Sequence, residues 1–332
     1  MRKKIFITGA SGFVGYHLVK TASERGYEIH AAVRKTSKID DIKPFVHKFV
    51  FPNMGNIDEL KALFQHEQYT HIIHAAAMTK AKRESDMFNV NVGYTENILE
   101  ASTTIVGILE KIVYVSSLAA IGPIAFDSPS LITEHTPYNP VTVYGRSKRV
   151  AEEMIKAKFA NSPIAVLRPT AVYGPRERDL FILFDTLNRG IDPYIGSKPQ
   201  KLSFVYVKDL VESILNACTI SQRDLQFYNI TDGQVYSRYA MADIFKNTFN
   251  RKSLRLHIPY ALVSFVARLS QSLYKRSSKT PVLYPERLGE LTAENWGCDI
   301  SKARQDLNFE PKYNLTLGLE ETLLWYKSNN WL

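Results

Sequence analysis

The feature that most constrains this chain is a glycine-rich turn close to its start. Residues 4–8 form an apolar run typical of a buried strand, and Gly9, Gly12 and Gly15 follow at the opening of a helical pattern. In such a strand–turn–helix unit, the glycines permit positive φ, close approach of a pyrophosphate and tight helix packing. The helix N-terminus attracts the phosphate charge. The pattern predicts a dinucleotide site, with a plain Gly-rich turn as the alternative.

The end of the second predicted strand indicates which dinucleotide is bound. Residues 28–33 read as that strand, and Arg34 follows where an NAD site would place an acid for the adenosine ribose. A guanidinium can make a bidentate contact with a 2′-phosphate, and the missing carboxylate removes a repulsion. We therefore expect NADP to be preferred over NAD. A solvated basic patch that includes Lys35 and Lys38 is the alternative.

A serine, a tyrosine and a lysine further along predict proton-transfer chemistry. Ser117 ends an apolar strand pattern over 112–116, where open α/β sheets place their ligands. Tyr144 and Lys148 are four residues apart, so they share one face of a helix. We expect the ammonium to lower the pKa of the phenol toward working pH. Tyr144 would then exchange a proton with a carbinol or carbonyl that Ser117 also holds, while a nicotinamide exchanges hydride.

The spacing of Tyr144 and Lys148 is not specific by itself. Tyr16 and Lys20 repeat it on the helix after the glycine turn, and Tyr194 and Lys198 repeat it in a Gly/Pro-flanked segment that is not expected to be helical. Only Tyr144 has a serine-bearing strand upstream. The combination, and not the spacing, selects Tyr144.

With these residues in place, the chain resembles the extended branch of the short-chain dehydrogenase/reductases, also called the NAD-dependent epimerase/dehydratase family. The resemblance covers nearly the whole chain. Besides the glycine turn and the Ser117, Tyr144 and Lys148 set, it rests on residues 74–76, 91–95, 167–169, 173–175, 204–209, 307–309 and 325–326. One departure is Tyr94, which stands where the family usually has glycine.

The resemblance implies roles for individual residues and a homodimer built from the helices that follow Asn91 and contain Tyr144. No metal is implied. The catalytic residues implied are Ser117, Tyr144, Lys148 and Asn91. The cofactor-binding residues are Gly9, Ser11, Gly12, Phe13, Val14, Gly15, Arg34, Asn56, Ile57, His74, Ala75, Ala76, Tyr144, Lys148, Pro169, Ala171 and Val172.

Two departures from the sugar-nucleotide members of the family bear on the substrate. Those members usually read Arg-x-x-Asn before the Tyr-Gly-Pro turn and carry an Arg before the later Asp, and both side chains hold a diphosphate. In this chain, Ala171 stands at the position of that asparagine and Leu202 at the position of that later arginine. The segment 26–34 is similar to dihydroflavonol-reductase-like members, and the tail 296–325 to 3β-hydroxysteroid-dehydrogenase-like members. We expect a lipophilic alcohol or ketone without a nucleotide. A nucleotide-sugar epimerase or dehydratase is the alternative, and a catalytically silent cofactor-binding scaffold is a second.

The length of 332 residues, 45% of them apolar, is enough for a large core in two domains. We expect an α/β Rossmann-type, doubly wound parallel sheet with a smaller substrate domain interleaved in sequence. The cofactor domain would span 1–170, with 200–231 returning to it, and 171–332 would be mainly substrate domain. The short β-like runs 204–207 and 227–230 are both expected to rejoin the main sheet.

Charge and cysteine usage exclude some function classes. The net charge is +9, but the basic residues are scattered and no recognition module accompanies them, so we expect no nucleic-acid partner. Cys218 and Cys298 are the two cysteines. Because the basic start runs directly into the glycine turn, we interpret the apolar run after it as a strand and not as a secretory leader. We expect a reduced, cytoplasmic protein acting on a small-molecule substrate, without a zinc site.

Residues 258–274 read as an amphipathic helix with basic flanks. Leu262, Phe265, Val266, Leu269 and Leu273 fall at helical spacing. The flanking bases are Arg251, Lys252, Arg255, Lys275 and Arg276. Ordinary packing against the substrate domain is one interpretation, and peripheral contact with a membrane is the other.

Overall fold

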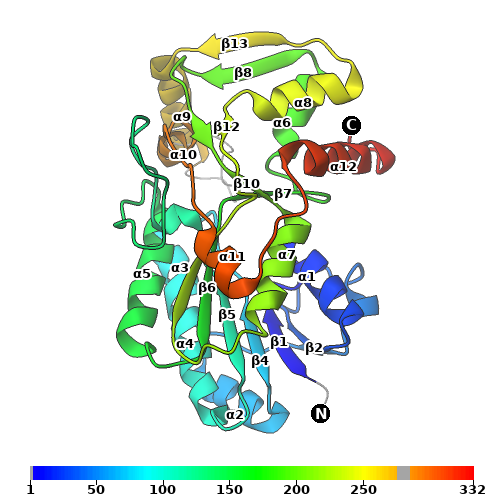
Figure 1. Cartoon of the computed structure of the whole chain (residues 1–332), viewed down its shortest axis with the longest axis vertical. Helices are drawn as coiled ribbons and strands as arrows, with labels where there is room; N and C mark the ends of the chain where they lie inside the picture. The colour runs from blue at the N-terminus through cyan, green and yellow to red at the C-terminus, as the bar shows by residue number, and fades with distance from the viewer. Residues whose placement is uncertain (1–2, 275–284) are drawn as a thin grey trace.

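A parallel sheet of seven strands forms the centre of the molecule (Figure 1). The computed structural model describes residues 3–274 and 285–332. The strand order is β11–β6–β5–β4–β1–β2–β3, so β1 lies beside β4 although β2 and β3 come between them in the sequence. The strands are β1 (Lys4–Thr8), β2 (Glu28–Ala32), β3 (Lys48–Val50), β4 (His71–His74), β5 (Lys111–Val115), β6 (Ile164–Pro169) and β11 (Gln226–Ile230). The expected doubly wound α/β fold is confirmed.

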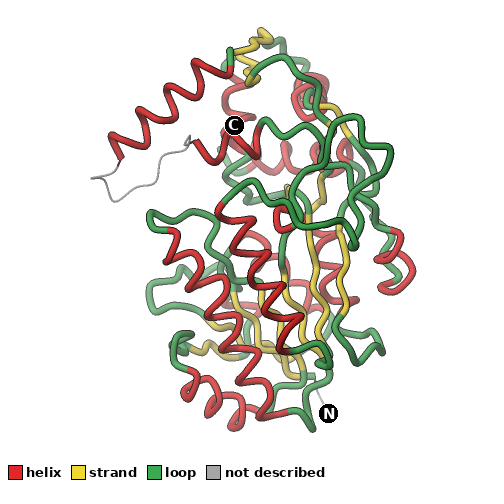
Figure 2. The backbone as a smooth tube through the Cα atoms, turned by 90° about the vertical axis from the view of Figure 1, so that its left-hand side faces the viewer, coloured by secondary structure: helices red, strands yellow, loops and turns green. Residues whose placement is uncertain are grey.

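Helices cover both faces of this sheet, as Figures 1 and 2 show. Because successive side chains of a strand point to opposite faces, Ile5 and Ile7 of β1 enter one apolar core and Phe6 enters the other. The first core is covered by α1 (Phe13–Glu24), α7 (Val207–Ala217) and α11 (Ser301–Leu307). The second is covered by α2 (Ile57–Glu67), α4 (Tyr94–Ser102) and α5 (Val143–Lys158), with α3 (Glu84–Phe88) beside α5.

A smaller unit lies beyond the carboxyl ends of the strands (Figure 1). Three two-stranded sheets and several helices build it around an aromatic-rich core that includes Phe184, Phe245 and Tyr326. Its strands are β7 (Ala171–Tyr173), β8 (Ile191–Ile195), β9 (Lys201–Leu202), β10 (Phe204–Tyr206), β12 (Tyr236–Ser237) and β13 (Leu254–Ile258). Its helices are α6 (Phe181–Asn188), α8 (Ala240–Phe249), α9 (Tyr260–Tyr274), α10 (Pro285–Leu291) and α12 (Leu315–Ser328).

One of the two strands expected to rejoin the main sheet does not do so. Strand β11 pairs with β6 at the edge of the sheet, with Gln226 opposite Ala165. Strand β10 instead pairs with β7 in a separate parallel sheet, with Phe204 opposite Ala171. Because β11 already occupies the free edge of β6, the expectation for residues 204–207 was wrong.

Helix α9 stands at the outer edge of the smaller unit, beside α10 (Figure 1). Its Val263 and Ala267 are buried against Leu288 of α10, which agrees with packing on one side. Its other side exposes apolar residues to solvent. The flanking bases Lys275 and Arg276 and the Leu273 side chain lie outside the described part of the chain. Among the described helices, none is both long and apolar enough to cross a bilayer.

Candidate active site

The glycine turn joins β1 to α1 and needs glycine at two positions for different reasons. Gly9 adopts a φ of +74°, and a Cβ there would lie 2.8 Å from the backbone of Ala75 and Ala76. A Cβ on Gly15 would lie 2.0 Å from the carbonyl oxygen of Gly9. Larger residues would therefore displace either the turn or the segment after β4.

The N-terminus of α1 fits an anionic phosphate group. The helix begins after Gly12 without a side-chain cap, and its first turn, which includes Phe13 and Val14, holds no acidic residue. A Cβ on Gly12 would meet only the Gly9 carbonyl oxygen, at 3.2 Å, so the turn is open on its other sides. The neighbouring Ser11 is exposed. Helix N–H groups without a cap are a suitable site for the pyrophosphate of a dinucleotide.

Three further cofactor candidates, Arg34, Asn56 and Ile57, lie along the same edge of the sheet. Arg34 follows β2 and is exposed, and its backbone N–H donates to Ser37 Oγ at 3.1 Å. Within the described residues, its guanidinium has no hydrogen-bonding or ionic partner. Asn56 caps α2, since its Oδ1 accepts from the backbone N–H of Asp58 at 3.1 Å. Ile57 is the first residue of that helix.

His74, at the end of β4, has a structural role that sequence alone did not reveal. Its Nδ1 is 2.6 Å from Thr8 Oγ1, and its Nε2 is 2.9 Å from Thr95 Oγ1. Thr8 also accepts from the N–H of Ala76 at 3.1 Å. Burial lowers the pKa of His74 to about 3, and the nearby Lys148 adds to the decrease. The neutral imidazole therefore ties β1, β4 and α4 together.

Asn91 is a buried clamp and lies in a π-helical turn, η2 (Asn89–Gly93), between α3 and α4. Its amide exchanges two hydrogen bonds with the backbone of Met78, at 2.7 and 2.9 Å. Its Nδ2 also donates to Ser147 Oγ at 2.9 Å. Asn91 thus holds the segment after β4 against α5, one turn from Tyr144.

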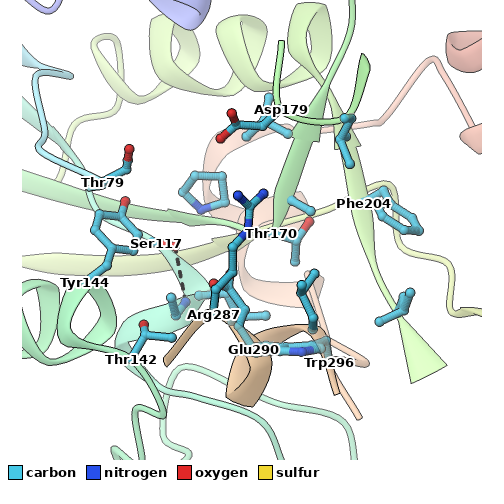
Figure 3. A pocket seen from close by; sticks show the side chains of 18 of the residues that line it. Thr79, Ser117, Thr142, Tyr144, Thr170, Asp179, Phe204, Arg287, Glu290 and Trp296 are labelled. Atoms are coloured by element: carbon cyan, nitrogen blue, oxygen red, sulfur yellow. Dashed lines mark hydrogen bonds between the residues drawn. The ribbon is translucent and has the colours of Figure 1, made fainter. Parts of the chain in front are cut away.

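A cavity of about 870 Å³ opens between the main sheet and the smaller unit. Figure 3 shows Tyr144 and Arg287 pointing into it, with Ser117 beside Tyr144. The cavity brings together residues from α3, α5, β6, β7, β10 and α10, and Ser117 from the segment after β5. Of the predicted site residues, it is lined by Ser117, Tyr144, Pro169, Ala171 and Val172. The glycine turn, Arg34, Asn56 and His74 lie outside its lining.

Tyr144 is positioned at the start of α5, where Thr142 caps the helix by accepting from the N–H of Gly145 at 3.0 Å. Burial raises the pKa of the Tyr144 phenol, and a hydrogen bond with Ser117 opposes part of the increase. The expectation that Lys148 lowers this pKa was wrong. The phenol is therefore protonated at neutral pH and is poised to donate a proton.

Lys148 is buried and directed toward β5. Its Nζ donates to the carbonyl oxygen of Val115 at 2.9 Å and to Tyr114 Oη at 3.1 Å. Burial lowers the pKa of Lys148 to about 7, although Glu152 raises it in part. A partly neutral amine with its hydrogen bonds on β5 cannot stabilise the Tyr144 phenolate strongly, so it does not offset the increase in the Tyr144 pKa that burial causes.

A buried ion pair, not anticipated from sequence, fixes α5 against β6. Arg168 Nη2 and Glu152 Oε2 are 2.6 Å apart, and both side chains are almost fully buried. Glu152 also accepts from Ser116 Oγ at 2.5 Å and from Tyr138 Oη at 2.7 Å. These bonds satisfy the carboxylate and set the helix that carries Tyr144 relative to the strand that ends at Pro169.

Sequence reasoning also missed the outer wall of the cavity. Arg287 and Glu290 of α10, together with Trp296, line it from the far end of the chain. They follow no motif or periodic pattern that marks them as site residues. No group of three or more His, Cys, Asp or Glu suited to a metal ion occurs in residues 3–274 and 285–332.

The fold and the glycine turn define the class of doubly wound, dinucleotide-binding α/β proteins. Within that class, residues 5–231 match the model of the NAD dependent epimerase/dehydratase family, and the chain belongs to this family. The resemblance seen in the sequence is thereby confirmed, as are the enzyme class and the nicotinamide cofactor.

Individual relatives act on different substrates. The chain is 26% identical to the 3 beta-hydroxysteroid dehydrogenase/Delta 5-->4-isomerase of Mycobacterium tuberculosis, over 98% of this chain and 90% of that protein. It is 24% identical to the N-acetyl-alpha-D-glucosaminyl-diphospho-ditrans,octacis-undecaprenol 4-epimerase of Escherichia coli O157:H7, over 97% of this chain and 95% of that protein. The structure is similar to that of the UDP-glucose 4-epimerase of Thermotoga maritima, with a TM-score of 0.79 and 20% sequence identity. The similarity covers 98% of this chain and 99% of that one.

Proposed function

We propose that this protein interconverts a secondary alcohol and a ketone on a lipophilic substrate that carries no nucleotide. The observation that carries the proposal is the position of Ala171 and Leu202, which both line the cavity. By the family resemblance, an asparagine amide and an arginine would stand there to hold a substrate diphosphate. Without them, a diphosphate loses charge-assisted hydrogen bonds worth about 1.5–3 kcal/mol each.

The remaining lining of the cavity supports an apolar substrate. Bulky apolar side chains come from both the main sheet side and the smaller unit, and they include Met87, Leu118, Leu183, Phe204, Met241 and Trp296. A cavity of about 870 Å³ is of the size that binds molecules as large as drugs. The named activity of the Mycobacterium tuberculosis relative concerns a steroid, which is such a molecule.

Three residues supply the proton chemistry in this proposal. Tyr144 donates a proton to the carbonyl oxygen of the ketone, since its raised pKa keeps the phenol protonated. Ser117, which hydrogen-bonds Tyr144, holds the same oxygen. Lys148 is a cofactor-ribose ligand and a proton relay behind the tyrosine. A nicotinamide bound beside Pro169 and Ala171 supplies or accepts the hydride.

We further propose that NADP(H) is preferred over NAD(H). Arg34 supports this because it is exposed after β2, with a guanidinium unpaired in the described part of the chain, where a 2′-phosphate would lie. NAD is the alternative cofactor, because solved proteins with this fold include the dTDP-glucose 4,6-dehydratase of Bacillus anthracis in complex with NAD.

A nucleotide-sugar epimerase or dehydratase is the second candidate function. Four cationic side chains, Lys80, Lys82, Arg238 and Arg287, line the cavity and favour an anionic substrate. Lys80 is paired with Asp179 at 2.8 Å. Arg238, however, donates to the carbonyl oxygens of Lys198 and Ile195, at 2.6 and 2.9 Å. The Arg238 guanidinium therefore already forms hydrogen bonds with the backbone at the end of β8.

Binding calorimetry in saturating NADP⁺ separates the two candidates. A hydrophobic 3-ketosteroid should bind with a Kd in the micromolar range, about −8 kcal/mol, and should be reduced when NADPH is supplied. UDP-glucose and dTDP-glucose should bind at least a hundredfold more weakly. Micromolar binding or turnover of either sugar nucleotide would overturn the proposal.

A further inference from the structure

Helix α9 presents an apolar surface that the rest of the described chain leaves uncovered. Leu262, Phe265, Val266 and Leu269 recur at helical spacing and are between 46% and 64% exposed. We call these four residues the outer face of α9. Scattered apolar side chains are common on surfaces, but four on one face of one helix form a continuous patch.

The stretch of sequence that contains this patch is basic. Between Asp243 and Glu286 the sequence contains no acidic residue and eight Lys or Arg. Of these bases, Arg268 lies on α9 itself and is exposed, whereas Arg251 and Lys252 are exposed ahead of β13. Lys246 and Arg255 are paired with Asp192. Basic residues beside an apolar helix face are typical of helices that lie in the interface of an anionic bilayer.

The patch is linked directly to the wall of the cavity. The inner side of α9, with Val263 and Ala267, is buried against Leu288 of α10. Helix α10 in turn lines the cavity through Arg287 and Leu291. A surface that docks through the outer face of α9 therefore lies one helix away from the space where the substrate binds.

We propose that α9 docks the protein on anionic lipid, with its outer face at the boundary of headgroups and acyl chains, and that a lipophilic substrate reaches the cavity from the bilayer past α10. The entry route rests on the proposed function, whereas docking does not. A second copy of the chain fits the patch less well, because a two-fold contact through this face would bring the Arg268 guanidinium groups of both copies into one interface.

Co-sedimentation with vesicles tests the docking. The protein should pellet with vesicles of phosphatidylglycerol and phosphatidylcholine at about 0.05 M NaCl, bind pure phosphatidylcholine at least tenfold more weakly, and be released at about 0.5 M NaCl. Phe265→Asp with Leu269→Asp should lower the partition constant at least tenfold. Leu324→Asp is the matched control, because Leu324 is 56% exposed on α12, and it should bind as the wild type does.

Light scattering and activity separate the possible failures. The double variant should keep the wild-type mass and the wild-type turnover of a water-soluble ketone, while losing turnover of a ketone embedded in the vesicles. A wild type that stays in the supernatant at low salt would overturn docking and leave the redox proposal intact. A change of mass in the double variant would overturn the membrane-docking proposal in favour of a contact between two chains through this face. If the double variant turned over the embedded ketone at the wild-type rate, the proposed entry route from the bilayer would be overturned.

Discussion

His74 should make the folded protein sensitive to acid through one identifiable side chain. The imidazole is buried between Thr8 and Thr95, and burial lowers its pKa from the ordinary value near 6.5 to about 3. Because the folded pKa is depressed, the unfolded chain binds more protons between these values. The stability that the neutral ring contributes is therefore fully present above about pH 6.5 and is lost as the pH falls toward 3.

The magnitude follows from the two pKa values. At pH 5 an unfolded histidine is almost fully protonated, whereas His74 is still neutral. The free energy of unfolding should then be lower by about 2 kcal/mol at pH 5 than at pH 8 from this residue alone. Replacing His74 with Asn removes that contribution, and at pH 8 it costs about 1–3 kcal/mol through the lost hydrogen bond with Thr95.

Urea unfolding of the wild type and of His74→Asn at pH 8 and pH 5 measures both quantities. The stability difference between the two proteins should shrink by about 2 kcal/mol at the lower pH. His135→Asn serves as the control for replacing a histidine at an exposed position. An equal loss of stability in the wild type and His74→Asn between pH 8 and pH 5 would refute the assignment of His74 as a neutral imidazole that stabilises the fold.

Three further predictions concern the cofactor, the buried lysine and the substrate. Arg34→Ala should weaken NADPH binding by about 1.5–3 kcal/mol in a fluorescence titration and barely change NADH binding; a wild type that prefers NADH would contradict it. The pKa of Lys148 is about 7 in the folded protein and 10.5 ordinarily, so the unfolded chain binds more protons between these values and the free energy of unfolding should rise between pH 8 and 10. Lys148→Met should abolish turnover, and in urea unfolding its rise over this pH range should be about 2 kcal/mol smaller than that of the wild type. Ala171→Asn with Leu202→Arg should strengthen UDP-glucose binding at least tenfold by calorimetry, and no gain would argue against a diphosphate subsite there.

The sequence predicted the main fold and much of the candidate site because these features are local. The glycine turn follows β1 directly, and its steric demands at Gly9 and Gly15 are met within a few residues. Tyr144 and Ser117 were paired through two short motifs, and both line the cavity. Pattern and position along the chain were sufficient for these assignments.

Other features depend on contacts that no local pattern encodes. Helical spacing placed Lys148 on the face of Tyr144, but its long side chain turns to Val115 and Tyr114 instead. The pairing of β10 with β7 depended on which strand occupied the edge of β6. Arg287 reaches the cavity from a part of the chain with no motif, so only the tertiary structure identifies it.

The most direct test of the proposed chemistry is a single-turnover measurement on Tyr144→Phe. The variant keeps the ring and removes only the hydroxyl that hydrogen-bonds Ser117. With NADPH bound and a lipophilic ketone in excess, NADPH oxidation should slow by about 10²–10⁴-fold, while the Kd for NADPH stays within about twofold of the wild-type value. Oxidation at the wild-type rate would contradict the assignment of Tyr144 as the proton donor.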